Sequence, residues 1–236
     1  MKLIKSLSAK IGALFGSIAH PAAPVATTTA PHIRALLLHL CNQDATRALW
    51  LARWLAYPLR HPGAKMQSAV IASGVQGAGS SLLFERIIAP MYGSQALIGG
   101  MPEKRPVKPW ALGMRYAVLM DLSPAELASS ALKNIIASSN IVVHRAGVPD
   151  IAISNSLNVV LMTNDAAQLD SELDNRRLFT LAPTHKLPID LAASVAHDIE
   201  NGGLIEFHQY LTQELDMGAF DQYTSPCYAV ESAVAA

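Results

Sequence analysis

The sequence predicts an α/β fold in which a mostly parallel sheet is flanked by helices, with further helical segments towards both ends. Three apolar runs, SAVIAS (68–73), RYAVLMDLS (115–123) and SLNVVLMTND (156–165), are separated by helix-length segments. Short apolar runs rich in Val, Ile, Leu and Met are typical of buried parallel strands. A glycine-rich stretch, GVQGAGSS (74–81), lies between the first run and a helical pattern. This strand, loop and helix are the central feature of the predicted fold.

Composition supports a globular protein with one sizeable core. The chain has 236 residues, of which 51% are hydrophobic and 15% charged. Eighteen basic residues balance eighteen acidic ones, so charge neither supports nor excludes nucleic-acid binding. Cys41 and Cys227 lack metal-ligand spacing and a paired pattern, which favours a reducing compartment. No apolar run is long enough to span a bilayer, so a membrane protein is not expected.

The N-terminal part divides into a helix, a linker and a helical lead-in. Residues 1–19 are predicted to form an amphipathic helix with one apolar face. The same stretch also resembles a signal peptide, but Lys10 interrupts that pattern. Residues 20–31, rich in Pro, Ala and Thr, are a predicted linker. Residues 32–66 contain one or two helices, which we expect to end at Tyr57-Pro58 because proline does not continue a helix comfortably.

The predicted core spans residues 67–188 and is followed by a C-terminal helical segment and tail, 189–236. Within the core, PAELASSALKNIIASS is a predicted helix with Pro124 in its first turn. NIVVHRAGVPDIAI is a predicted hairpin, and RRLFTLAP a further short strand. In the C-terminal segment, Asn201-Gly202-Gly203 is expected to separate two helices.

The glycine-rich stretch matches the phosphate-binding pattern G-x-x-x-x-G-K-[ST] at every required position except one. Ser80 stands where the pattern has the lysine that reaches the β- and γ-phosphates, and Ser81 stands at the Mg²⁺-ligand position. Backbone N–H groups of such a loop cradle an anion without help from the lysine. Gly74, Gly77, Gly79, Ser80 and Ser81 are therefore predicted to bind phosphate. The alternative is a tight turn that only packs the helix against the strand.

Polar residues that end the other two apolar runs are candidates for the same site. Asp121 ends the second run, where a nucleotide hydrolase of this architecture places the acid that organises Mg²⁺ and water. Its alternative role is to cap the helix that begins near Ser123-Pro124. Asn164 ends the third run and is placed to orient a lytic water or sense the γ-phosphate, although asparagine is also an ordinary turn former.

Two arginines precede the last predicted strand. Arg176 and Arg177 are candidates for fingers that reach the phosphates of a neighbouring subunit. A solvated basic corner is the plainer interpretation of the same pair.

In order and spacing these pieces resemble the helicase domain of phage and plasmid primase-helicase proteins, a superfamily 3, AAA+-like group. The resemblance runs from about residue 32 to residue 229 and implies a P-loop NTPase core that uses ATP and Mg²⁺. It implies a cytoplasmic protein of a bacterium or phage-infected cell that acts on DNA, single-stranded for preference, as a ring-shaped homo-oligomer such as a hexamer. A separate primase or replication protein would be its partner. By the same resemblance Arg145, in the predicted hairpin, faces DNA.

The sequence departs from the family pattern at three positions. Ser80 replaces the phosphate lysine, Leu122 breaks the acidic pair after Asp121, and Asn175 replaces an aspartate before the arginines. Losing one transition-state charge costs about 3 kcal/mol, and losing a catalytic carboxylate about 10²–10⁴-fold in rate. The expected function is therefore a helicase-type ATPase domain whose hydrolysis is weak or lost.

Three hypotheses remain open at this stage. Lys65, Lys104 or Lys133 could replace the missing charge in an active enzyme. The chain could instead be a non-enzymatic DNA-binding or ring-scaffold relative of the family. A third hypothesis, association with a membrane surface, depends on the N-terminal helix alone.

Overall fold

A computed structural model describes residues 29–226 apart from 101–110, 128, 144–146, 148 and 164–176. The predicted N-terminal helix, most of the linker, Asn164, Arg176 and Arg145 lie outside the described residues. The strands of the described part are β1 (Ala69–Ala72), β2 (Ala96–Gly99), β3 (Tyr116–Met120), β4 (Asn140–Val143), β5 (Ile151–Ser154), β6 (Asn158–Met162) and β7 (Leu178–Leu181).

Five of these strands form one parallel sheet in the order β2-β3-β6-β1-β7, and β4 and β5 form a separate antiparallel hairpin. The predicted α/β class, the three apolar strands, the hairpin and the last strand are confirmed. Strand β2 was not predicted, because it is four residues long and only partly buried. Since β6 lies between β1 and β3, the ends of these three neighbouring strands share one edge of the sheet.

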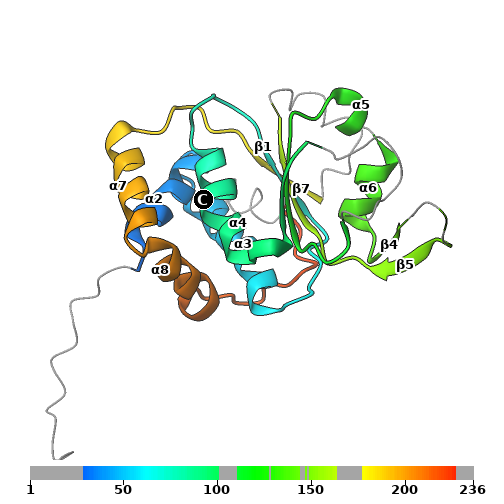
Figure 1. Cartoon of the computed structure of the whole chain (residues 1–236). Coiled ribbons are helices and arrows are strands. Elements are labelled where there is room, and N and C mark those ends of the chain that lie inside the picture. Colours follow the sequence, from blue (N-terminus) through cyan, green and yellow to red (C-terminus); the bar gives the residue numbers. More distant parts are fainter. Residues whose placement is uncertain are drawn as a thin grey trace, which may run out of the picture.

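Helices cover both faces of the sheet (Figure 1). The helical elements are α2 (Pro31–Leu40), α3 (Ala45–Arg60), the π-helix η1 (Leu82–Ile88), α4 (Ala89–Tyr92), the 3-10 helix η2 (Gly93–Gln95), α5 (Pro124–Leu127), α6 (Ser130–Ala137), α7 (Ile189–Glu200), α8 (Gly203–Gln209) and the π-helix η6 (Tyr210–Glu214). Helices α2, α3, α4, α7 and α8 lie on one side of the sheet, and α5, α6 and the hairpin on the other.

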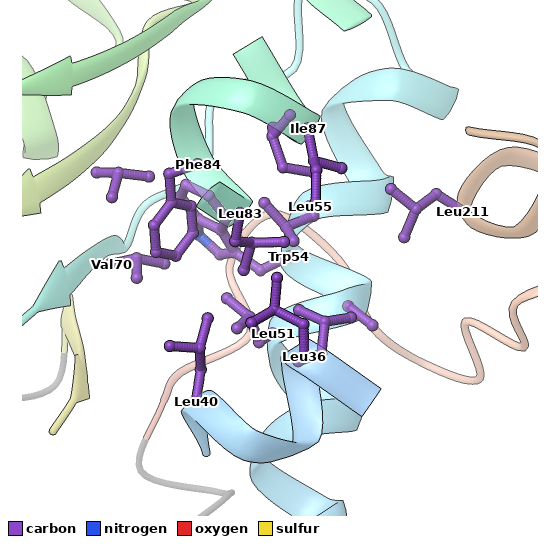
Figure 2. Close-up of a cluster of buried hydrophobic side chains, with 14 of the residues drawn as sticks. Leu36, Leu40, Leu51, Trp54, Leu55, Val70, Leu83, Phe84, Ile87 and Leu211 are labelled. Carbon is purple, nitrogen blue, oxygen red and sulfur yellow. The ribbon is translucent and has the colours of Figure 1, made fainter. Parts of the chain in front are cut away.

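Successive residues of the buried strands point to opposite faces of the sheet and belong to two different cores. Val70 of β1 and Val118 of β3 join the core under α2, α3 and η1, whereas their neighbours Ile71 and Leu119 join the core under α6. Figure 2 shows the first core, where Trp54 of α3 lies among leucines of α2, α3 and η1. Both faces of the central strands are therefore buried, which explains their continuous apolar sequence.

Two helix boundaries differ from the prediction. Helix α3 continues through Pro58 to Arg60 instead of ending there. Proline lacks one N–H donor, and in the last turn of a helix this costs a single hydrogen bond while Pro58 itself is buried in the core. The segment predicted as one helix from Pro124 contains two helices, α5 and α6. Helix α6 is capped at its N-terminus by Ser129, whose hydroxyl accepts from Leu132 N–H at 3.2 Å. The predicted break at Asn201-Gly202 between α7 and α8 is confirmed.

Candidate functional site

The glycine-rich loop leaves the carboxyl end of β1 and enters a helix at Ser80. Gly74, Gly77 and Gly79 have φ angles of 114°, 85° and 103°, which L-amino acids rarely adopt. A side chain at Gly74 would lie 2.7 Å from the Pro183 carbonyl oxygen, and one at Gly79 would lie 2.9 Å from a Leu36 methyl group. Gly77 has nothing within 4 Å of its Cβ position and faces open space.

Most of the loop's backbone N–H groups are free to bind an anion. Val75 N–H donates to the Pro183 carbonyl at 3.1 Å, and Ala78 N–H to the Val75 carbonyl at 3.2 Å. Within the described part of the chain, no hydrogen-bond acceptor is found for the amides of Gln76, Gly77, Gly79, Ser80 and Ser81. Five unpaired donors at a helix N-terminus make a cradle for an anion.

This loop forms one wall of a cavity of about 560 Å³. The cavity is lined by the loop and by the carboxyl ends of β1, β3 and β6: Ala72, Ser73, Gly74, Val75, Gln76, Gly77, Ala78, Gly79, Ser80, Ser81, Leu82, Met120, Asp121, Leu122, Met162 and Thr163. The structure thus brings the five predicted loop residues and Asp121 together around one space. Among the described residues that line it, Asp121 is the only ionisable one.

Asp121 faces this cavity and does not cap the following helix. Within the described ranges its carboxylate has no hydrogen-bond or ion-pair partner, and its φ is 53°, a left-handed conformation that Asp tolerates better than most residues. Helix α5 is capped instead by Ser123, whose N–H and hydroxyl donate to a Glu126 carboxylate oxygen at 2.8 and 2.6 Å. This reciprocal arrangement is a capping box.

Glu126 is therefore held in a helix cap and is not placed as the missing water-activating carboxylate. We expect Glu126→Ala to lower the free energy of unfolding by about 1 kcal/mol, while Glu126→Gln keeps most of the stability because glutamine also closes a capping box. Neither change should alter the rate of any nucleotide hydrolysis that the chain shows. Denaturant unfolding and an ATPase assay on both variants test this, and a loss of turnover at full stability would assign Glu126 to the reaction.

Thr163 is a lining residue that sequence analysis did not single out. It is buried, and its N–H donates to the Ala72 carbonyl at 3.1 Å, which fixes the end of β6 beside the start of the loop. Its position directly before Asn164, at the end of an apolar strand, was the signal that could have identified it.

The opposite edge of the sheet holds Arg177 and Lys65. Arg177 comes immediately before β7, whose first residue Leu178 pairs with Ala69 at the start of β1. Because β1 and β7 are parallel, Arg177 lies at the amino edge and cannot reach the cavity of its own chain.

Lys65 does not replace the missing lysine. It lies before β1, its side chain is buried, and its ammonium donates to the Met66 carbonyl at 3.0 Å. Burial, with the charge of Arg177 as a second cause, lowers the pKa of Lys65 to about 7. Of the two other candidates, Lys133 lies on α6 and does not line the cavity, and Lys104 is outside the described residues.

The donors around the cavity suit Mg²⁺ better than a metal held by a full set of protein ligands. Among the described residues no group of three or more His, Cys, Asp and Glu side chains could hold a metal ion. Magnesium, however, is commonly bound by one or two protein ligands together with substrate phosphates. Asp121 and the Ser81 hydroxyl fit that pattern.

The fold is similar to that of the C-terminal region of NrS-1, seen in three solved apo structures. Their TM-scores are 0.65, 0.61 and 0.60, at 18%, 18% and 17% identity, and the matches cover 90%, 84% and 86% of this chain. The chain spans about half the length of these neighbours, 55%, 50% and 51%. At such identity the likeness shows the fold alone. No family model and no curated protein matches the sequence.

No helix in the part of the chain that the structure describes has the length and apolar character to cross a membrane.

Proposed function

We propose that this chain is a helicase-like ATPase domain of the superfamily 3 type, from a phage or plasmid replication system, that binds ATP with Mg²⁺ and hydrolyses it slowly or not at all. The observation that carries the proposal is a set of five loop residues that line one cavity together with Asp121 and whose backbone amides have no acceptor within the described part of the chain. The fold shared with the NrS-1 C-terminal region supports the same class.

Different residues around the cavity would bind the phosphates and the Mg²⁺ ion. The loop amides from Gln76 to Ser81 hold the phosphate oxygens, and the helix dipole adds to their positive potential. Ser81 and Asp121 bind Mg²⁺, which when present bridges phosphate oxygens and neutralises their charge. Asn164 would sense the γ-phosphate from the end of β6.

Other residues would act between molecules. The place of Arg177 at the amino edge supports a finger role, shared with Arg176, towards the ATP of the next subunit in a ring, and a hexamer is the arrangement we favour. Arg145 of the hairpin would contact single-stranded DNA, and a separate primase would supply priming.

Slow hydrolysis follows from two missing groups. Ser80 supplies no positive charge at the γ-phosphate, and Glu126 is engaged in a helix cap. Ground-state binding depends on the amides and Mg²⁺ and survives both losses. The missing charge at position 80 and the missing catalytic carboxylate also favour a second candidate function, that of a non-enzymatic ring scaffold or DNA-binding relative of the family.

Binding of ATP to the full chain, measured with and without Mg²⁺, tests the proposal. We expect Mg²⁺ to raise ATP affinity about 10-fold or more, and Asp121→Asn to abolish this gain, because an amide carries no charge for the ion. Asparagine tolerates the left-handed backbone at this position, so the fold should persist. Glu206→Gln, an exposed change on α8, is the matched control.

Two results would change the assignment. A folded wild-type chain that binds no ATP would reject the nucleotide site and leave the scaffold function. Fast turnover stimulated by single-stranded DNA, and lost in Asp121→Asn, would show that hydrolysis is intact.

A further inference from the structure

A segment far along the chain lies directly against the glycine-rich loop. The connection from β7 to α7, residues 182–188, contacts the loop at two points: the Pro183 carbonyl accepts from Val75 N–H at 3.1 Å, and Leu187 N–H donates to the Gly77 carbonyl at 3.0 Å. In Figure 1 this yellow connection passes beside the teal connection that follows β1. Residues 184–186 therefore run along the loop between two hydrogen bonds to it.

The turn after α2 holds the same segment from the other side. The Asn42 side-chain oxygen accepts from Thr184 N–H at 2.9 Å and from the Thr184 hydroxyl at 3.1 Å, while its amide nitrogen donates to the Ala182 carbonyl at 2.9 Å. The backbone of the segment is thus fixed on both sides, and residues 185 and 186 are carried at a defined place beside the loop.

Those two residues, His185 and Lys186, can carry positive charge, which the lining of the cavity lacks. The His185 ring nitrogen Nδ1 is 2.8 Å from the Thr184 hydroxyl, so that ring is already engaged. Lys186 is exposed, and within the described part of the chain its ammonium has no hydrogen-bond or ion-pair partner.

Lys186 does not itself line the cavity, but the residue next to it in the chain lies against the loop. The next residue, Leu187, has a methyl group 3.2 Å from the Cβ position of Gly79, and Gly79 immediately precedes Ser80. The backbone that carries Lys186 therefore adjoins the place from which a phosphate-loop lysine would extend. A lysine carries its charge on a flexible four-carbon stem, which suits it to reach a ligand from a neighbouring segment.

We propose that Lys186 supplies the positive charge that the loop lacks at Ser80, by binding the β- and γ-phosphates of a nucleoside triphosphate from the connection between β7 and α7. This inference rests on the proposed nucleotide site and adds a residue to it.

A double-mutant cycle between positions 80 and 186 tests it. The dissociation constants of ATP and AMP, both with Mg²⁺, are measured for the wild type, Ser80→Lys, Lys186→Ala and the double variant. We expect Lys186→Ala to weaken ATP binding about 10-fold or more and to leave AMP binding unchanged, because AMP has no β- or γ-phosphate. With lysine at position 80, the same alanine change should cost less than about 3-fold, since the charge is then supplied by the loop.

Two further variants separate a charge effect from a structural one. Lys186→Arg keeps the charge and should bind ATP within about 3-fold of the wild type. Lys133→Ala removes a lysine from α6, away from the cavity lining, and should leave the ATP dissociation constant unchanged. Thermal unfolding without nucleotide should be the same for Lys186→Ala and the wild type, because Lys186 is exposed and has no partner among the described residues.

Each contrary outcome has a distinct meaning. The role of Lys186 is overturned if Lys186→Ala leaves ATP affinity unchanged, or if it lowers ATP affinity equally with serine and with lysine at position 80. Either result leaves the nucleotide site in place. The same holds if only the Ser80→Lys variants bind ATP. If no variant binds ATP, the nucleotide site itself is rejected and the role of Lys186 with it.

Discussion

Replacing Gly74 with alanine is expected to lower the free energy of unfolding by about 3 kcal/mol or more. Its φ of 114° is a conformation that alanine adopts only with strain, which costs about 1–3 kcal/mol. The added Cβ would also lie 2.7 Å from the Pro183 carbonyl oxygen and 3.0 Å from the Pro183 nitrogen. Both are backbone atoms, so the contact cannot be relieved by moving a side chain.

Gly77→Ala is the matched control for this change. Gly77 also has a positive φ, 85°, but nothing lies within 4 Å of its Cβ position. Its replacement should therefore cost only the conformational strain, about 1–2 kcal/mol. Denaturant unfolding of both variants measures the difference. Equal losses would show that the contact between the loop and Pro183 does not constrain position 74.

The same comparison bears on ligand binding. Pro183 belongs to the segment that carries Lys186, so Gly74→Ala should displace that segment and weaken ATP binding together with stability. Gly77→Ala leaves the contact with Pro183 intact, and its effect on ATP affinity should be smaller.

Replacing Lys65 with methionine is expected to stabilise the protein at neutral pH by on the order of 4 kcal/mol. Burial lowers the pKa of Lys65 from 10.5 to about 7, so at neutral pH and below folding must either bury a charge or release a proton. Methionine retains an unbranched apolar chain of similar length and removes that cost.

The pH dependence gives a second measure of the same effect. Above about pH 7 the folded state has lost the Lys65 proton, whereas the unfolded state keeps it until about pH 10.5, so the unfolded state binds more protons. The stability of the wild type should therefore rise with pH through this window, by up to about 1.4 kcal/mol per pH unit, and this rise should be absent from Lys65→Met.

The useful range of this measurement ends near pH 9. Burial raises the pKa of the Cys41 thiol from 9.0 to about 12, and it raises the pKa values of Tyr92 and Tyr116 above the usual 10.0. The unfolded state loses these protons first, so these three groups lower stability at higher pH. Parallel slopes for wild type and Lys65→Met between about pH 6 and pH 9 would contradict the assigned pKa of Lys65.

Much of the sheet could be predicted from the sequence, because its central strands are buried on both faces and are uniformly apolar. The runs around Val70, Val118 and Val160 were placed to within three residues, and the glycine loop was placed between its strand and helix. Strand β2 escaped prediction because its residues, ALIG, are few and partly exposed. The end of α3 was misplaced because Pro58 lies in a last turn, where a missing N–H costs little.

The part of the candidate site that follows the carboxyl ends of the strands could be predicted from the sequence. Residues that follow parallel strands meet at one edge, so Asp121 and the loop could be expected together. The same rule, applied to the start of β7, would have placed Arg177 at the other edge. The engagement of Glu126 in a helix cap was signalled by the Ser-x-x-Glu pattern of residues 123–126, a capping-box signature that the sequence analysis did not use.

The sequence by itself determined the central strands, the glycine loop and the absence of a lysine at position 80, because apolar runs and glycine-rich turns are patterns of neighbouring residues. Only the tertiary structure decided that Lys65 is buried at the far edge and that Lys186 lies beside the loop. Some 110 residues separate Gly77 from Leu187 in the chain. They are in contact because β7 pairs with β1, so that the carboxyl end of β7 lies next to the loop. Strand pairing depends on contacts between residues far apart in the chain, and a local sequence pattern does not specify them.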